Sequence, residues 1–153
     1  MRVLGIDTSN YTTSVSVVDE TGYRSCRRIL SVKEGARGLR QSDALFLHTQ
    51  NLPDLLMELH PEHIDAVAYS ARPRDVEGSY MPCFLAGKLA AVAAAEVAGV
   101  PIFSFSHQAG HIMAAVKSCG HEAELGEEFL AFHISGGTTE LLHVLRKAKG
   151  GFD

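Results

Sequence analysis

The two histidines at positions 107 and 111 are the residues in this sequence whose types and spacing best suit chemistry. A short apolar run at residues 100–105 precedes them and is typical of a strand, and Ser106 is a residue type that caps helices. On a helix that begins here, His107 and His111 lie four positions apart on one face. The two rings could then ligate one metal ion or meet one anion.

Two imidazoles do not complete a metal site. A third ligand such as a carboxylate is needed, and the spacing leaves its identity open, with Asp7 among the candidates. The pair also lacks the intervening glutamate that serves as general base in the zinc-protease pattern. A purely structural role for the two histidines therefore stays an alternative. The other histidines are scattered and are predicted to be surface groups or satisfied, partly buried residues: His48, His60, His63, His121, His133 and His143.

Two turns between predicted strands could contact a phosphate. In the later one, Ser135-Gly136-Gly137-Thr138, glycines let backbone N–H groups approach an anion and hydroxyls add donors. The earlier one, Asp7-Thr8-Ser9-Asn10, offers a carboxylate that could orient a metal or water. The alternative for the later turn is an ordinary hairpin turn without a ligand. The alternative for the earlier turn is that its carboxylate only caps the turn itself.

The elements that must position these groups follow from hydrophobic periodicity and turn residues. The helix beginning near Ser42 contains Pro53, which should kink or split it, and the next helix is predicted to be capped by Ser79 and to end at Gly99. The predicted strands are residues 2–9, 12–18, 23–30, 64–69, 100–105, 129–134 and 139–145.

This order predicts an α/β fold. Three antiparallel strands that lead through helices into parallel strands, β-β-β-α-β-α-β-α, are the plan of a ribonuclease-H-like lobe. The second hairpin looks like the same plan starting again, as in actin-like phosphotransferases, whose two lobes each direct their first hairpin turn at a phosphate. We therefore predict a first lobe at residues 1–120, followed at 121–153 by a linker and the beginning of a second, incomplete lobe. A lone hairpin is marginal in water, so it should fold back on the lobe, pair with another copy or be poorly ordered.

Composition limits the function classes. With 46% apolar residues, 21% charged residues and a formal charge of −4, the 153-residue chain should bury a core and has no overall basic surface for nucleic acid. One local basic stretch is a solvated face or a contact for a phosphate-bearing partner: Arg24, Arg27, Arg28, Lys33, Arg37 and Arg40. Three widely spaced cysteines and a first apolar run broken by Asp7 predict a cytoplasmic protein without disulfides or a membrane span.

Four motifs, in this order and spacing, resemble the tRNA threonylcarbamoyladenosine transferase family, long called O-sialoglycoprotein endopeptidases or glycoproteases. They are Met1-Arg2-Val3-Leu4-Gly5-Ile6-Asp7-Thr8-Ser9, Ile64-Asp65-Ala66-Val67-Ala68-Tyr69-Ser70, His107-x-x-Gly110-His111 and Ser135-Gly136-Gly137-Thr138-Thr139-Glu140-Leu141. The resemblance implies an actin-like fold, a divalent metal (iron or zinc), an adenine nucleotide or threonylcarbamoyl-adenylate, and transfer of threonylcarbamoyl to N6 of adenosine 37 in tRNA. It also implies a smaller actin-like partner subunit and an ATPase subunit.

By the same resemblance, individual residues acquire expected roles. His107 and His111 match the metal ligands, and the third ligand is an aspartate of the second lobe that lies beyond this chain. The nucleotide or substrate would meet the first turn and a later segment, which are Thr8, Ser9, Asn10, His133, Ile134, Ser135, Gly136, Gly137 and Thr138. No residue is assigned a catalytic role.

Three departures from the family pattern indicate a diverged paralogue. The segment Ser9-Asn10-Tyr11-Thr12-Thr13 lacks the family's acidic pair, Ala71-Arg72-Pro73-Arg74-Asp75 replaces a Gly-Pro-Gly loop, and Thr138 stands for a histidine. Two functional hypotheses follow: the lobe of a metal-dependent transferase, or a non-catalytic actin-like module that dimerises or binds partners, a homodimer included. Protease activity is disfavoured because no nucleophile–base pair is evident.

Overall fold

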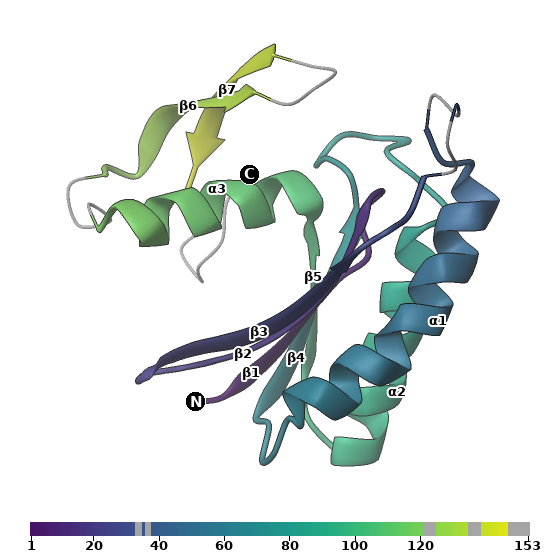
Figure 1. Cartoon of the computed structure of the whole chain (residues 1–153). Coiled ribbons are helices and arrows are strands. Elements are labelled where there is room, and N and C mark those ends of the chain that lie inside the picture. The colour runs from purple at the N-terminus through teal and green to yellow at the C-terminus, as the bar shows by residue number, and fades with distance from the viewer. Residues whose placement is uncertain (33–34, 36–37, 121–124, 135–138, 147–153) are drawn as a thin grey trace. The chain divides into compact units, whose positions relative to one another are not determined.

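The computed structural model describes residues 1–32, 35, 38–120, 125–134 and 139–146. By their internal contacts, the residues form two compact units (Figure 1), a first unit at Met1–His107 and a second unit at Gln108–Asp153. The predicted division into a first lobe at residues 1–120 and the beginning of a second lobe at 121–153 stays a prediction.

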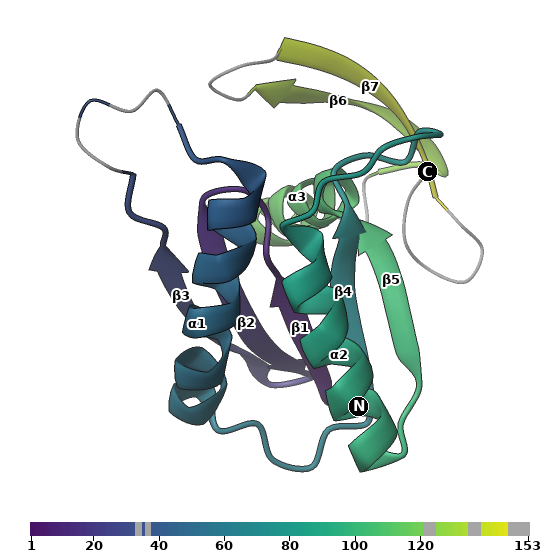
Figure 2. The ribbon, with the colours of Figure 1, turned by 90° about the vertical axis from the view of Figure 1, so that its right-hand side faces the viewer.

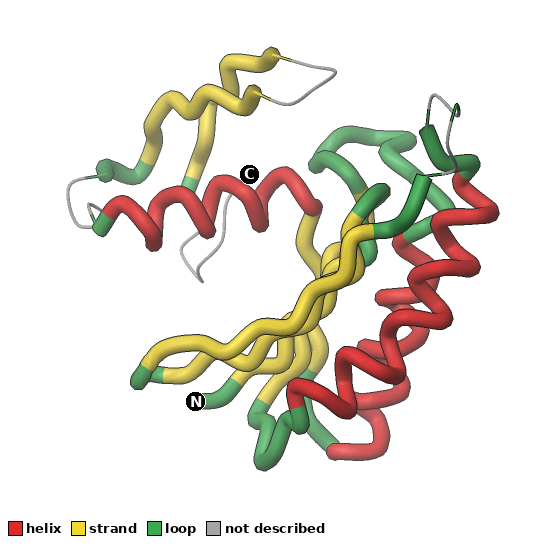
Figure 3. The backbone as a smooth tube through the Cα atoms, viewed as in Figure 1, coloured by secondary structure: helices red, strands yellow, loops and turns green. Residues whose placement is uncertain are grey.

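The first unit is built on one mixed sheet of five strands in the order β3-β2-β1-β4-β5 (Figures 1 and 2). The strands are β1 (Val3–Asp7), β2 (Thr12–Asp19), β3 (Gly22–Ile29), β4 (Ala66–Arg72) and β5 (Ile102–Ser106). The first three form an antiparallel meander, while β4 lies parallel to β1 and β5 parallel to β4, as predicted. Helices α1 (Gln41–Leu59) and α2 (Phe84–Ala98) cover the same face of this sheet (Figure 3).

Alternation along the strands builds the core of the first unit. Leu4 and Ile6 on β1 and Val15 and Val17 on β2 are buried toward the helices, as a strand period of two requires. Opposite them lies the buried stripe of α1, which contains Leu52, Leu55 and Leu59, and the alanines of α2 complete the layer, namely Ala86, Ala91 and Ala95.

Two predictions about helix ends and breaks differ from the structure. Helix α1 continues through Pro53, so the predicted split is wrong, while the predicted kink stays a prediction; Pro53 lies on the exposed side, where water can replace the missing amide hydrogen bond. Helix α2 begins at Phe84, and Ser79 is not its cap; the Ser79 hydroxyl instead accepts a hydrogen bond from the Arg74 backbone N–H at 3.0 Å. The predicted end is confirmed, since Gly99 closes α2 with a left-handed φ of 67°.

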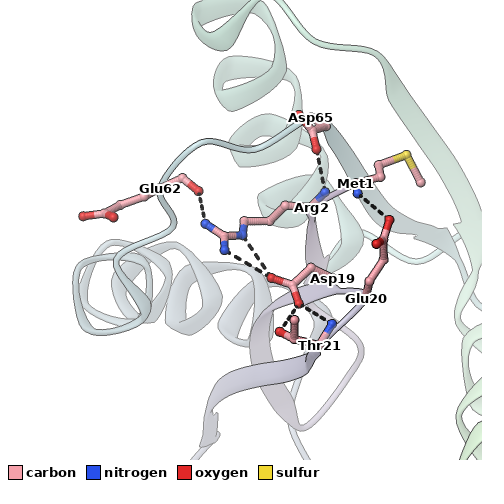
Figure 4. Close-up of polar contacts among 7 residues, drawn as sticks. All are labelled: Met1, Arg2, Asp19, Glu20, Thr21, Glu62 and Asp65. Carbon is pink, nitrogen blue, oxygen red and sulfur yellow. Dashed lines mark hydrogen bonds and ion pairs between the residues drawn. The ribbon is translucent and has the colours of Figure 1, made fainter.

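The amino-terminal end of β1 is fixed by a network of charged groups (Figure 4). The guanidinium of Arg2 donates from Nε and Nη2 to Asp19 Oδ2, both at 3.2 Å, and from Nη1 to the Glu62 carbonyl at 3.1 Å. Hydrogen bonds from Thr21, with help from Arg2, lower the pKa of Asp19 to about 2. This network joins the β2–β3 turn to the segment before β4, at the end of β1 opposite to Asp7.

The second unit consists of most of α3 (His107–Cys119) and a hairpin of β6 (Glu128–Ile134) and β7 (Thr139–Leu145). Val116 of α3 and Val144 of β7 are its buried centre, with Ile112, Met113, Leu125, Phe129, Ala131 and Leu142 around them. Of the three alternatives predicted for the hairpin, folding back on the chain is therefore observed, with α3 as the packing surface. The other hairpin face is exposed and includes four large apolar side chains: Leu130, Phe132, Ile134 and Leu141.

No helix among the described residues is long and apolar enough to cross a membrane.

Candidate functional site

The carboxyl ends of three parallel strands bring polar side chains together in the first unit. Strand β1 ends at Asp7, its neighbour β4 carries Ser70, and β5 leads directly into His107. Side chains at the carboxyl edge of parallel strands are where ligands usually bind in α/β folds. The contacts among these three residues, which are far apart in the sequence, define the candidate site.

Asp7 is the centre of this site. Its Oδ1 accepts the backbone N–H of Ser9 at 2.8 Å, while its Oδ2 lies 2.8 Å from His107 Nδ1 and accepts the Ser70 hydroxyl. Burial by itself would raise the pKa of Asp7, but the hydrogen bond and charge of His107, together with Ser70 and Ser9, hold it well below its usual range. The predicted alternative in which Asp7 caps its own turn is thus confirmed, while its role in orienting a metal or water stays a prediction. The contact of Asp7 with a site histidine was not predicted.

Thr8 is completely buried and joins the site to α2. Its hydroxyl donates to the Cys83 carbonyl at 3.0 Å and accepts the Gly87 N–H at 3.1 Å. A Cβ at Gly87 would lie 2.8 Å from Thr8 Oγ1, so only glycine allows this approach. The Thr8 side chain is therefore engaged inside the first unit, and a nucleotide contact at this position stays a prediction.

Ser9 and Asn10 lie half-buried at the turn itself. Asn10 Oδ1 accepts from Gln41 Nε2 at 3.4 Å, and Gln41 Oε1 accepts from the Cys83 backbone N–H at the same distance. Gln41, at the start of α1, thus bridges the turn and the start of α2. Nothing in the local sequence distinguished Gln41 as a turn-holding residue.

A second polar cluster occupies the same edge of the sheet. Asp75 forms an ion pair with Arg72, and its Oδ2 accepts the Ser106 hydroxyl at 2.6 Å. These residues include the charged loop that replaces the family's Gly-Pro-Gly segment, so the substitution adds an internal ion pair next to β5. The predicted capping of α3 by Ser106 stays a prediction.

The second unit holds the other histidines of the predicted site. The rings of His111 and His133 lie 5.8 Å apart between centroids, and His133 Nδ1 is 3.4 Å from Glu140 Oε2. The same Glu140 oxygen accepts Gln108 Nε2 at 2.9 Å. The sequence indicates no role for Gln108, and Glu140 lies in one of the family-like motifs without an expected role. Ile134 is 73% exposed, and the predicted anion-binding turn, residues 135–138, lies outside the described residues.

The metal prediction concerns two residues of one helix, since His107 and His111 both belong to α3. Among the residues that the structure describes, no group of three or more histidine, cysteine or acidic side chains is placed to hold a metal ion. The described residues therefore supply imidazoles without a third protein ligand.

The sheet order and helix placement define the class of protein first: an α/β lobe with the ribonuclease-H-like fold, as predicted. In agreement, the structure superimposes on YeaZ from Pseudomonas aeruginosa with a TM-score of 0.59 at 18% identity, covering 98% of this chain and 62% of that one. A second structure from that organism, described as similar to peptidase YeaZ, gives a TM-score of 0.57 at 16% identity with the same coverage.

Sequence comparison then identifies the relatives. The chain is 31% identical over 150 residues to the tRNA N6-adenosine threonylcarbamoyltransferase of Ehrlichia canis, covering 93% of this chain and 40% of that protein. For the Ignicoccus hospitalis enzyme of the same name, the identity is 29% over 145 residues, covering 91% and 41%. No family model matches. The chain is a diverged relative of these transferases, as its motifs predict, and it spans about two fifths of their length.

Proposed function

We propose that this chain is the first lobe of a metal-dependent, nucleotide-binding transferase that modifies tRNA by transferring threonylcarbamoyl to N6 of adenosine 37. The observation that carries the proposal is the Asp7–His107 contact of 2.8 Å at the carboxyl edge of the sheet. It places one motif of the transferase relatives directly against another, in the region where α/β folds bind ligands.

His107 and His111 would hold the metal. Imidazole suits both zinc and iron, and a ligating histidine usually has its other ring nitrogen bonded to a carboxylate, which is the arrangement of His107 with Asp7. The bound metal would supply a Lewis acid or template for the threonylcarbamoyl group. The third ligand would come from the part of the relatives that this chain does not match.

The nucleotide or threonylcarbamoyl-adenylate would meet the turn after β1 and the segment around β6. Ser9 and Asn10 are partly accessible at the first turn, which Asp7 and Gln41 hold in place. Residues 133–138 would form the second contact, by resemblance to the family. In this proposal, the sheet edge binds and orients the substrate while Asp7 fixes the position of an imidazole.

Partner subunits are part of the proposal: a smaller actin-like subunit, an ATPase and tRNA, in the cytoplasm. Helix α2 presents apolar side chains that its own unit leaves exposed, which are Leu85, Leu89, Val92 and Val97. An exposed apolar patch of this kind is typical of a protein–protein interface. A homodimer through the same surface is the alternative.

Metal analysis of the purified chain tests the proposal. With zinc or iron added, we expect the wild type to bind the metal and His107→Ala to bind less of it. His143→Ala is the matched control, because His143 is an exposed histidine whose Nε2 contacts Glu128 at 2.8 Å. A wild-type protein without bound metal, and unchanged by His107→Ala, would remove the site.

A second candidate function is a non-catalytic actin-like module. It is favoured by residues 9–13, where Tyr11 and Thr12 occupy the region of the family's acidic pair and offer no carboxylate. Under this proposal, a complex with an actin-like partner forms equally well with and without nucleotide and with a chelator present. Dissociation of the complex by chelator would favour the transferase lobe instead.

A further inference from the structure

We infer that Asp7 is a positioning residue that holds the His107 imidazole in the tautomer with a lone pair on Nε2, and that Ser70 holds Asp7 in place. The inference goes beyond the ligand assignment, because it gives roles to two residues that touch no metal. It rests on the proposed function only for the identity of what binds at Nε2.

Three hydrogen-bond donors surround the Asp7 carboxylate. Asp7 receives the Ser9 N–H on one oxygen, and the Ser70 hydroxyl and His107 Nδ1 on the other. An ionised carboxylate has no hydrogen to donate. The hydrogen in the 2.8 Å contact must therefore sit on Nδ1 of His107, and a neutral ring then has its lone pair on Nε2.

The sheet itself, and not a loop, sets this geometry. Strands β1 and β4 are in parallel register, with Ile6 beside Tyr69. The next residues, Asp7 and Ser70, therefore lie side by side and both point to the other face of the sheet. Strand β5 lies beside β4 and ends one residue before His107. All three residues belong to the first unit.

The chemical consequence concerns affinity. A metal binds the unprotonated nitrogen of a neutral imidazole, so a ring with a fixed tautomer binds without first moving its proton. A carboxylate behind a ligating histidine typically contributes about 10- to 100-fold in metal affinity. Ser70 acts one step further away, so its loss should have a smaller effect in the same direction.

Asp7→Asn tests the role of the carboxylate with little change in shape. The amide can present an N–H to Nδ1 as readily as an oxygen, so the tautomer is no longer fixed. Titration of the full-length chain with Co²⁺, followed by its visible absorption, should show affinity about 10- to 100-fold weaker than wild type. The Co²⁺ affinity of Ser70→Ala should lie between those of the wild type and Asp7→Asn. This variant also supplies a second measurement if Asp7→Asn folds poorly.

Asp19→Asn is the matched control. Asp19 is also a strand-end aspartate with a hydroxyl, a backbone N–H and a cationic side chain as donors, but it lies at the opposite end of the sheet. Its variant should bind Co²⁺ as the wild type does. If wild type, Asp7→Asn and Ser70→Ala all bound Co²⁺ with the same measurable affinity, the inference would be overturned.

A readout without metal separates this inference from the proposed function. In the ¹⁵N-labelled, metal-free chain, the ring nitrogens of His107, assigned with His107→Gln, should show a protonated Nδ1 in the wild type and a mixture of tautomers in Asp7→Asn. If the wild type bound no Co²⁺ while this tautomer difference held, the metal proposal would fail and the role of Asp7 would stand. Identical ring-nitrogen spectra for His107 in the two proteins would exclude the positioning role.

Discussion

The two units of this chain bury their apolar side chains to different extents. The first unit has a five-strand sheet with two helices on one face and a core whose central members, such as Leu55 and Val67, are fully buried. The second unit has two strands and part of one helix, with Val116 and Val144 as its buried centre. Leu130 and Phe132 on the outer hairpin face are 65% and 73% exposed.

The difference shows where a site can be held without help. A two-stranded sheet is marginal on its own, whereas a sheet of five strands with a helical layer can fix side chains at its edge. The Asp7–His107 contact accordingly lies in the first unit, and the predicted contacts of His133 lie in the second. We expect the first unit to keep its geometry through perturbations that open the second.

Core truncation should separate the two units most clearly. Leu55→Ala should cost the first unit about 2–5 kcal/mol of unfolding free energy, because it leaves a cavity beneath the sheet. Val144→Ala should cost the second unit about 2 kcal/mol and leave the first unchanged. All four tyrosines lie in the first unit, so tyrosine fluorescence in urea reports on that unit, and amide exchange of β6 and β7 reports on the other. A common transition for both probes would contradict independent units.

Acid should weaken the first unit through His48. This histidine is completely buried, and among the described residues its Nε2 has no hydrogen-bond partner, while Nδ1 contacts Thr13 Oγ1 at 2.8 Å. Its burial was not predicted. Desolvation, offset in part by the charge of Asp7, lowers the pKa of His48 to about 4 from 6.5.

The unfolded chain therefore binds the His48 proton more readily than the folded one between these two values. Stability is full above pH 6.5 and falls by up to about 3 kcal/mol as the pH drops toward 4. Urea titrations of wild type and His48→Leu at pH 7.5 and 4.5 measure this loss. The variant should lack the wild-type difference, and equal pH dependence of the two proteins would refute the assignment.

A pair of glycine substitutions compares close packing in the two units. Gly87→Ala should destabilise the first unit by about 1–3 kcal/mol, since the new Cβ would displace the Thr8 hydroxyl from its two hydrogen bonds. Gly110→Ala on α3 has no described atom within 4 Å of the new Cβ and should add up to about 1 kcal/mol of helix stability. Circular dichroism melts of the two variants should therefore shift in opposite directions.

Substitution on the outer face of the β6–β7 hairpin should change the unfolding free energy least. Leu130→Thr places a β-branched residue of high strand propensity on β6 and removes an exposed apolar side chain, so the unfolding free energy should change by less than about 0.5 kcal/mol. Amide exchange of β6 is the measurement. A loss above about 1 kcal/mol would indicate that this face is covered in solution, and the contrast between the two units would then be smaller.

Local patterns in the sequence determined the elements. Alternation specified the strands of the meander and the hairpin, and Gly99 marked the end of α2, because these features depend on periods of two and 3.6 residues and on one backbone conformation. The motifs also determined the family resemblance. Pro53 did not split α1 as one of its two predicted effects required, since whether a proline ends a helix depends on which face of the helix it occupies.

Tertiary structure alone decided which groups meet. Asp7 and His107 are 100 positions apart, and Thr8 and Gly87 are 79 apart, so no local pattern could pair them. The strand order brings the ends of β1, β4 and β5 to one edge, and the packing of α1 on β2 buries His48 against Thr13. The residue types were visible in the sequence, but their contacts required the sheet, because parallel strands place distant residues side by side.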